Sequence, residues 1–363
     1  MLRLPGLIDP HVHMREPGAA HKEDWDSGTA AALAGGFTLV LAMPNTQPPV
    51  VDAASLELAR SAARSKARCD YAQYLGAGPD NTHWNVDLAG QCAGLKMYLD
   101  QTYGPLRLDE MSLWAAHLQN WPRLAPDGSV RPVAVHAEGR TLAAAILQAA
   151  LHDCPLHLCH VSQREEILLI RAAKERGLKI TCEVTPHHLF LTQADIAGPG
   201  SGRAEVRPSL ATPADRDALW ENLDVIDVFA TDHAPHTIAE KDGPNPPPGF
   251  PGLETALPLL LTAVHAGRLT LDDLVLRMVT NPRRIFGLPE QPETWIEIDP
   301  DAHSEIKASR MYSRSQWTPF EGQPVTGRLE RVVLRGHTVY DQGQVLAAPG
   351  FGQDIRSTLD RSK

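Results

Sequence analysis

The stretch Gly6-Leu-Ile-Asp-Pro-His-Val-His13 is an apolar segment that ends in two histidines separated by one residue. In a β-strand, side chains two positions apart point to the same side, so His11 and His13 can face one metal ion. A single pair of this kind is weak evidence, because surface strands carry such pairs by chance. Other short apolar segments also end in residues that bind metals or carry protons, namely Lys96, His136, Cys159 with His160, Glu183 and Asp232. This repetition predicts a barrel whose active site lies at one rim.

The body of each segment supports parallel strands. The candidate strands are mostly unbroken apolar segments rather than alternating ones, which is typical of strands buried on both faces. In chain order they are residues 6–11, 37–43, 70–75, 94–99, 132–136, 156–160, 180–184 and 225–230. Between them lie helix-like stretches rich in Ala, Leu, Glu and Arg, at residues 24–34, 53–65, 108–119, 141–150, 163–176 and 214–222. A repeated strand–helix unit predicts an α/β protein with a closed parallel (β/α)8 TIM barrel.

The remaining length predicts a small appendage on the barrel. A barrel of this type takes about 250 residues, and the chain has 363. We expect the barrel to occupy residues 6–289, including further helices at 253–266 and 271–279. Residues 290 to about 319 are polar and irregular and receive no assignment, whereas 328–335 and 337–345 have the pattern of strands. Together with residues 1–5 they predict a small β-rich accessory domain, 1–5 plus 290–350, built from both terminal segments. Residues 351–363 are expected to form a flexible tail.

Composition excludes several classes of partner. The formal net charge is −10, and no long basic segment occurs, which argues against nucleic acid or an anionic membrane as the main partner. No stretch approaches about 18 uninterrupted apolar residues, and the start of the chain does not have the pattern of a signal peptide. The five cysteines include no C-x-x-C pair, so we expect a reduced, cytoplasmic chain.

The carboxyl ends of barrel strands are where active sites lie. In this chain those ends carry His11, His13, Asn45, Lys96, His136, Cys159, His160, Glu183 and Asp232, with His233 and His236 close behind. Histidine, aspartate and a modified lysine suit two borderline metal ions such as Zn²⁺. Any one buried histidine is more often an ordinary core residue, but the shared position of these residues favours a metal site.

Lys96 lies within a strand segment, where a buried ammonium is costly. One interpretation is a lysine whose charged end reaches solvent at the strand end. The other is a carbamate, formed when the neutral amine takes up CO₂, which offers one anionic oxygen to each of two metal ions.

Several motifs together resemble those of dihydroorotases, a family of the amidohydrolase superfamily. The matching segments are Gly6-Leu-Ile-Asp-Pro-His-Val-His-Met-Arg-Glu-Pro-Gly18, Ala42-Met-Pro-Asn-Thr46, Gly94-Leu-Lys-Met-Tyr98, Val135-His-Ala-Glu138 and Ala230-Thr-Asp-His-Ala-Pro-His236. The resemblance runs nearly end to end and is strongest to the dihydroorotase domains of animal multifunctional pyrimidine-synthesis proteins. Segments 182–190, 246–254 and 317–322 support this closer placement.

This resemblance implies a role for each candidate residue. His11, His13 and Asp232 would hold one zinc ion, His136 and His160 a second, and carboxylated Lys96 would bridge them. A third zinc ion would have His11, Cys159 and Glu183 as ligands. The substrate's α-carboxylate would be bound by Arg15, Asn45 and His236, and its ring amide by backbone groups of Arg207 and Pro248. Thr102 and Tyr103 would belong to a flexible lid; without the resemblance, that loop is an ordinary polar connection.

The implied reaction is the reversible cyclisation of N-carbamoyl-L-aspartate to dihydroorotate in pyrimidine biosynthesis. A hydroxide bridging two zinc ions would be the nucleophile in ring opening, and Asp232 the general acid and base. The resemblance further implies a homodimer and a place within a larger multifunctional polypeptide.

Two alternatives remain open at this point. A hydantoinase, dihydropyrimidinase or allantoinase would share the barrel and the metal ions, but has less need of Arg15 and Asn45, which favour a ring bearing a carboxylate. A non-catalytic relative would use the barrel as a scaffold for assembly. Such relatives lose metal ligands, whereas this chain has all of them.

Overall fold

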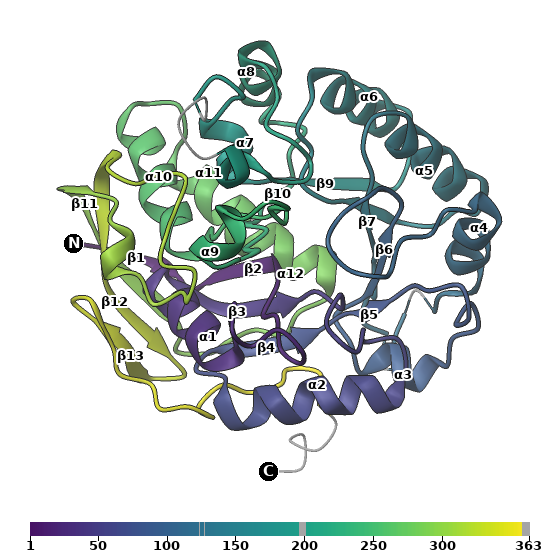
Figure 1. Cartoon of the computed structure of the whole chain (residues 1–363), viewed down its shortest axis with the longest axis horizontal. Helices are drawn as coiled ribbons and strands as arrows, with labels where there is room; N and C mark the ends of the chain where they lie inside the picture. Colours follow the sequence, from purple (N-terminus) through teal and green to yellow (C-terminus); the bar gives the residue numbers. More distant parts are fainter. Residues whose placement is uncertain (123, 127, 196–200, 358–363) are drawn as a thin grey trace.

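The computed structural model places β-strands at the centre of the molecule and helices around them (Figure 1). It describes residues 1–122, 124–126, 128–195 and 201–357. The central strands are β2 (Leu7–Val12), β3 (Phe37–Ala42), β4 (Asp70–Gln73), β5 (Leu75–Gly76), β6 (Leu95–Tyr98), β7 (Val133–His136), β8 (Leu156–Leu158), β9 (Ile180–Val184) and β10 (Val228–Phe229). Every residue of β2 and β3 is buried, as expected for strands covered on both faces.

These strands pair in parallel in two sheets. One has the order β2-β3-β4 and the other β10-β9-β8-β7-β6-β5. The predicted third strand is divided at Tyr74, so β4 pairs with β3 while β5 pairs with β6. A parallel bridge between Val12 and His233 links the end of β2 to the segment after β10. The two sheets therefore meet at both of their outer strands, and the carboxyl ends of all these strands face one side.

The helices agree with the sequence pattern in most places. They are α1 (Trp25–Ala34), α2 (Ala53–Lys66), α3 (Val86–Gly90), α4 (Met111–Asn120), α5 (Arg140–Leu151), α6 (Arg164–Glu175), α7 (Pro186–Phe190), α8 (Pro213–Glu221), α9 (Ile238–Lys241), α10 (Leu253–His265), α11 (Leu271–Val275) and α12 (Asn281–Phe286). The short helices α3, α7 and α9 are not among the predicted ones, because four or five residues are too few to show a helical period. Their first turns are capped locally; for example, Thr237 accepts a hydrogen bond from the backbone N–H of Glu240 before α9.

A separate antiparallel sheet is formed by both terminal parts of the chain. Its order is β1 (Leu2–Pro5), β11 (Trp295–Glu305), β12 (Pro324–Leu334), β13 (His337–Asp341) and β14 (Gln344–Val345). The expected pairing of residues 2–5 with this sheet is observed, against β11. Strand β11 lies in the segment that received no assignment. Its alternation is partial, with Ile296 and Ile298 buried between polar neighbours, and the pattern disappears after Asp299.

The prediction of a flexible tail over residues 351–363 is wrong for residues 351–357. Residues 351–357 pack against the parallel sheets: Tyr71 forms a parallel bridge with Asp354, and Arg60 Nε lies 2.5 Å from a carboxylate oxygen of Asp354. Arg356 is buried and donates to the carbonyl of Phe286. Buried arginine contacts fix this segment, although its composition is polar. Residues 358–363 lie outside the described part of the chain.

Among the described helices, none combines the length and the apolar character that a membrane span requires.

Candidate metal centre and substrate pocket

The strand ends converge on one small pocket. Its lining includes most of the predicted site residues, together with three that were not predicted for it, Tyr98, Ala234 and Gly249. The lining residues are His11, His13, Arg15, Asn45, Tyr98, Thr102, Tyr103, His136, His160, Arg207, Asp232, Ala234, Pro248 and Gly249. These residues come from β2, β6 and β7 and from the segments after β2, β3, β6, β8, β9 and β10, so the pocket depends on most of the central strands.

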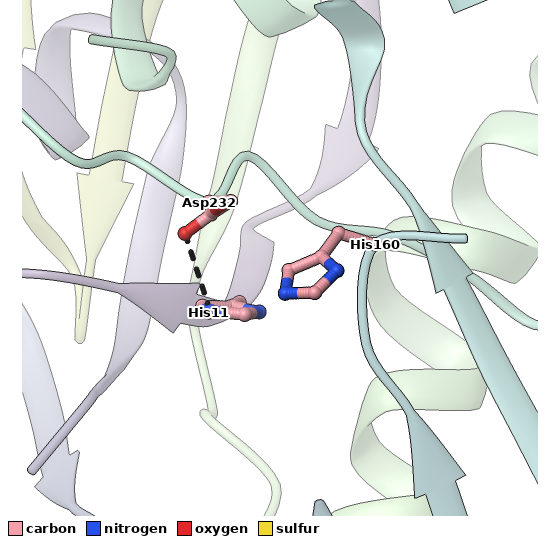
Figure 2. A group of neighbouring side chains, drawn as sticks. All are labelled: His11, His160 and Asp232. Carbon is pink, nitrogen blue, oxygen red and sulfur yellow. Dashed lines mark ion pairs between the residues drawn. The ribbon is translucent and has the colours of Figure 1, made fainter. Parts of the chain in front are cut away.

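Asp232 lies between His11 of β2 and His13, which directly follows that strand. Its Oδ1 atom is 3.2 Å from His11 Nε2 and 3.0 Å from His13 Nε2. Figure 2 shows His11, His160 and Asp232 pointing toward one another from three separate segments. One potential ligand atom from each of these three residues lies within 4.8 Å of the others, and all three side chains are buried. This is a preformed group of metal-ligand type.

A second group of the same type shares His11. One ligand atom each from His11, Cys159 and Glu183 lies within 4.8 Å of the others. His11 Nδ1 contacts Glu183 Oε1, and the other carboxylate oxygen of Glu183 accepts from His157 Nε2 at 3.1 Å. Lys96 is completely buried and donates from Nζ to Cys159 Sγ at 2.8 Å. The lysine therefore ends inside the ligand cluster rather than at the surface, against the first of its two interpretations.

The residues fit a metal ion for a specific reason at His13. Asn45 Nδ2 donates to the carbonyl of Tyr103, which directs Asn45 Oδ1 toward His13 Nδ1 at 2.7 Å. His13 Nδ1 thus carries the hydrogen, and burial lowers the pKa of His13 to about 4, which keeps the ring neutral. Its Nε2 lone pair then faces Asp232 Oδ1 at 3.0 Å. A positive charge between them, from a metal ion or a proton, satisfies both lone pairs.

The remaining histidines point to the same conclusion. His136 Nδ1 and His160 Nε2 are 2.8 Å apart, so one of them donates to the other. Among the described residues, His160 Nδ1 has no hydrogen-bond partner, and His136 Nε2 has only a carboxylate oxygen of Glu138 at 3.4 Å, although both nitrogen atoms are buried. Buried imidazole nitrogens without partners are uncommon in proteins. Imidazole, thiolate and carboxylate donors together suit zinc.

Charge within the cluster is balanced by protons. Burial and Lys96 lower the pKa of His11, but Glu183, Asp232 and Cys159 outweigh them and raise it to about 10. Burial raises the pKa of Asp232, but His11 and His13 hold it below its ordinary value. The anionic side chains therefore stabilise a positive charge at this position, which is what a metal ion would supply.

A cationic subsite adjoins the cluster. Arg15 Nε donates to the carbonyl of Pro235, and its Nη2 lies 3.0 Å from His236 Nε2. Lys22 Nζ donates to His236 Nδ1 at 3.0 Å, so the ring hydrogen is on Nε2 and points to the Pro248 carbonyl, also at 3.0 Å. An N–H of Arg15 therefore has no acceptor in this ring and is available to a carboxylate. Burial, with Arg15 and Lys22, lowers the pKa of His236 well below its usual range and keeps it neutral.

The predicted lid loop is closed over this subsite. The Tyr103 ring centroid lies 4.8 Å from Arg15 Cζ, 4.6 Å from Lys22 Nζ and 5.2 Å from the His236 ring. The cavity that remains has a volume of about 20 Å³, which is room for one or two water molecules. A ring substrate therefore requires the loop to move, which agrees with a lid.

Arg207 and Pro248 line the pocket on another side. The Arg207 guanidinium donates to Val206 O and to Ser209 Oγ, and lies 3.3 Å from a Glu205 carboxylate oxygen. All three contacts are made by Nη1 of the guanidinium.

Three residues of the site have strained backbone. Arg15, His160 and Asp232 have φ values of 58°, 36° and 46°, in a region that residues other than glycine adopt rarely. Such strain persists where surrounding contacts hold the residue in place and is frequent at functional sites. In this protein the three strained residues, which come from separate segments, all line the same small pocket.

The sequence patterns missed three contributors. Asp9 is fully buried and accepts from His11 N and from Thr231 N and Oγ1, which joins the two ligand-bearing segments. Lys22 lies in a polar stretch with no motif. The Tyr98 hydroxyl is buried without a hydrogen-bond partner among the described residues. Asp9 lies two residues before His11, and Tyr98 lies two residues after Lys96. Because alternate residues of a strand share a face, this spacing was the signal that could have found both residues.

A larger groove lies elsewhere. It has a volume of about 750 Å³ between α10 and the antiparallel sheet, and its lining includes Glu254, Lys307 and Tyr312. It contains none of the strand-end residues that form the ligand cluster. Donor chemistry rather than size therefore identifies the functional site.

Solved structures define the class of protein. The fold matches an L-hydantoinase (dihydropyrimidinase) from Arthrobacter aurescens with a TM-score of 0.88 and 25% identity, covering 98% of this chain and 88% of that one. It also matches the inactive dihydroorotase-like domain of a Chaetomium thermophilum CAD-like multifunctional protein, with a TM-score of 0.82, 30% identity, and 98% and 99% coverage. The fold is that of the cyclic amidohydrolases.

Sequence relatives define the family. A model described as dihydro-orotase-like matches residues 1–89. The chain is 54% identical, over 98% of its length, to the multifunctional protein CAD of Squalus acanthias, of which it spans 16%. It is 35% identical to the dihydroorotase of Pyrococcus furiosus, covering 95% of this chain and 83% of that protein. The chain belongs to the dihydroorotase family, which confirms the resemblance seen in the motifs.

Proposed function

We propose that the protein is a zinc-dependent dihydroorotase, which interconverts N-carbamoyl-L-aspartate and dihydroorotate in pyrimidine biosynthesis. The observation that carries this proposal is the position of the cationic subsite, with Arg15 and the neutral His236, directly beside the ligand cluster. A cyclic amide that also bears a carboxylate would place its amide at the cluster and its charge at the arginine. The 35% identity to a free-standing dihydroorotase adds support.

The architecture that we propose is a (β/α)8 barrel over residues 6–289 with a small β-rich accessory domain, 1–5 plus 290–350. The parallel order of the central strands and the Val12–His233 bridge support a closed barrel. The antiparallel sheet supports the second unit. Active sites in such barrels lie at the carboxyl ends of the strands, where the pocket is found.

The proposed metal ligands fall into three sets. His11, His13 and Asp232 would hold one zinc ion, His136 and His160 a second, with carboxylated Lys96 bridging both. Cys159 and Glu183, with His11, would hold a third ion. When bound, zinc supplies Lewis acidity, which makes water nucleophilic near neutral pH and polarises a carbonyl. The burial of Lys96 within this cluster supports the carbamate, because an ammonium there opposes metal binding.

Asp232 would carry the proton. In ring opening, its carboxylate accepts a proton from the attacking water and then delivers it to the leaving ring nitrogen as the C–N bond breaks. In cyclisation the same steps run backward: the Asp232 carboxylate accepts the proton that the ureido nitrogen loses as it bonds to carbon. It then delivers this proton to the departing hydroxyl of the substrate's protonated carboxyl group, which leaves as water. The contacts with His11 and His13 hold the carboxylate in place for both directions.

Substrate recognition would use three groups of residues. The Arg15 guanidinium, Asn45 and His236 bind the α-carboxylate, since a guanidinium donates two parallel hydrogen bonds to such a group. Backbone groups of Arg207 and Pro248 contact the ring amide. The lid residues Thr102 and Tyr103 close over the bound substrate and exclude water.

Two other functions are less well supported. A hydantoinase-type activity agrees with the fold, but a neutral ring gives no role to an arginine that is held in a strained backbone conformation. A non-catalytic scaffold is suggested by the inactive domain with 30% identity. Against it, this chain brings its ligand residues together with atoms within 4.8 Å of one another.

The wider setting is also part of the proposal. The chain would act within a larger multifunctional polypeptide, as its high identity to a segment of the much longer CAD protein suggests. We further propose a homodimer in the cytoplasm, with small-molecule substrates and without nucleic acid or membrane as partner.

The decisive experiment measures zinc content and initial rates on purified protein. We expect turnover of dihydroorotate and N-carbamoyl-L-aspartate, with dihydrouracil and hydantoin turned over at least about 100-fold more slowly, because each lost charge-assisted hydrogen bond costs about 1.5–3 kcal/mol. Turnover of the neutral rings at equal rates would favour the hydantoinase alternative. Zinc-replete protein without turnover of any of these substrates would favour the scaffold.

A further inference from the structure

A buried ammonium group lies behind one wall of the pocket, at the end of α9. The side chain of Lys241 is fully buried, and its Nζ donates to the backbone carbonyls of Glu205 at 2.7 Å, Pro247 at 2.9 Å and Gly249 at 3.3 Å. An ammonium has three N–H donors and no acceptor, so these three bonds satisfy it completely. The lysine thus binds main chain, whereas the carboxylate of Glu205 pairs with Arg207.

A charge at this buried position lowers the stability of the folded protein. Nζ lies 5.6 Å from the Phe250 ring centroid and 5.4 Å from that of Trp317, and burial lowers the pKa of Lys241 to about 8. Apolar side chains of similar volume often stabilise such positions as well as a buried charge does. A buried lysine that binds only carbonyls therefore calls for a role beyond stability.

The three carbonyls belong to the two segments that form this wall. Glu205 lies two residues before Arg207, and Pro247 and Gly249 flank Pro248. The segments also join directly, because Gly249 N donates to Glu205 O at 3.0 Å. A side chain is excluded at Gly249, where an added Cβ would lie 2.4 Å from Ala234 O. The wall is made of backbone, so its shape depends on what holds that backbone.

We propose that Lys241 is a positioning residue that sets the substrate specificity of the pocket: its ammonium clamps the 205–207 and 247–249 segments together, so that the backbone of Arg207 and Pro248 meets the ring amide of the substrate. This inference rests on the proposed function. Lys241 does not line the pocket, and it acts through the three carbonyls. A displacement of these backbone groups weakens binding that the substrate and the transition state share, which raises KM and leaves kcat nearly unchanged.

The test compares variants of zinc-loaded full-length chain. Lys241→Met removes all three donors at nearly constant volume, and Lys241→Gln keeps two N–H donors. Lys174→Met is the matched control, since Lys174 Nζ also donates to a backbone carbonyl, that of Val225 at 2.6 Å, but away from the pocket. For each protein we would measure the melting temperature, zinc content, kcat and KM for dihydroorotate.

For Lys241→Met we expect KM to rise at least about tenfold while kcat stays within about threefold and zinc is retained, because ring binding is lost and the metal cluster is intact. Lys241→Gln should recover part of the KM, and it carries the test if the methionine variant does not fold. Lys174→Met should lower the melting temperature and leave KM unchanged.

Two results would overturn the inference. In one, both Lys241 variants lose thermal stability but keep the wild-type KM, which would reduce the lysine to a structural role. In the other, kcat and zinc content fall with an unchanged KM, which would show that the lysine acts on the ligand cluster rather than on the pocket wall. If the wild-type protein itself does not turn over dihydroorotate, the proposed function fails instead, so the two failures are distinguishable.

Discussion

Substitution of Asp232 by asparagine isolates the proton-carrying role in the proposed reaction. Asparagine has the same shape, and its Oδ1 remains within reach of His11 Nε2 and His13 Nε2, which lie 3.2 Å and 3.0 Å from the carboxylate oxygen. The side chain is buried, and its replacement leaves the surrounding packing in place. We therefore expect a folded protein that has lost the ability to accept a proton.

The expected fall in reaction rate follows from the loss of this proton carrier. Removal of a general acid or base costs about 10²–10⁴ in rate, or about 3–5 kcal/mol in the activation barrier. The burial of Asp232 places the effect at the upper end, because bulk water does not reach the reacting atoms to replace the carboxylate. Since the equilibrium constant of the reaction is independent of the enzyme, kcat/KM must fall by the same factor in both directions.

The assay is the initial rate of ring opening and of ring closure, measured with zinc content and melting temperature on the same samples. Asp227→Asn is the control, because Asp227 is a half-buried aspartate that pairs with Lys174 away from the pocket. An Asp232→Asn protein that retains zinc and turns over within about tenfold of wild type would refute the role of Asp232. Unequal losses in the two directions would show that the assays do not report one reaction.

Four further predictions follow from the site and its surroundings. Lys96→Ala should lose activity and part of its zinc, and short carboxylic acids should restore some activity; an unmodified lysine mass in active zinc-loaded protein would contradict the carbamate. Thr102→Ala and Tyr103→Leu should lower turnover about 10-fold or more with zinc retained, because the lid orients substrate and excludes water; unchanged kinetics in both would make the loop an ordinary connection. Tyr98→Phe removes a buried hydroxyl without a partner among the described residues, so thermal stability should be equal or higher while activity falls; a lower melting temperature with full activity would assign the hydroxyl a structural role. Burial raises the pKa of Glu254 to about 8, so between about pH 4.5 and 8 the unfolded chain releases a proton that the folded chain keeps, and stability should fall as pH rises. Glu254→Gln should flatten the dependence of melting temperature on pH in that window, and an unaltered slope would contradict the shift.

Local pattern was sufficient to predict most of the central strands and to predict that the residues at their ends lie close together. The apolar segments ending at His136 and Glu183 are continuous in sequence, and their burial on both faces produces a composition that is visible without a structure. The functional side chains sit where these segments end, because parallel strands present all their carboxyl ends to one side. The order of His11, His13, Lys96 and Asp232 along the chain was therefore enough to predict one site.

Other features depend on contacts between distant segments. Asp9 and Thr231 are 222 positions apart, and Lys22 and His236 are 214 apart, so no window of sequence contains either pair. Strand β11 was missed because it lies in an antiparallel sheet with solvent on one side, and polar residues dominate its second half.

Lys241 is the clearest example of a residue whose contacts are set by the tertiary structure rather than by the local sequence. As a residue of a short polar helix it has the sequence context of an exposed lysine, yet it is fully buried against three carbonyls. Those acceptors are backbone atoms, which every residue possesses and which therefore leave no trace in the amino-acid sequence. Side-chain chemistry and strand composition are properties of each segment alone, whereas the partners of a buried charge are set when the folded chain brings separate loops together.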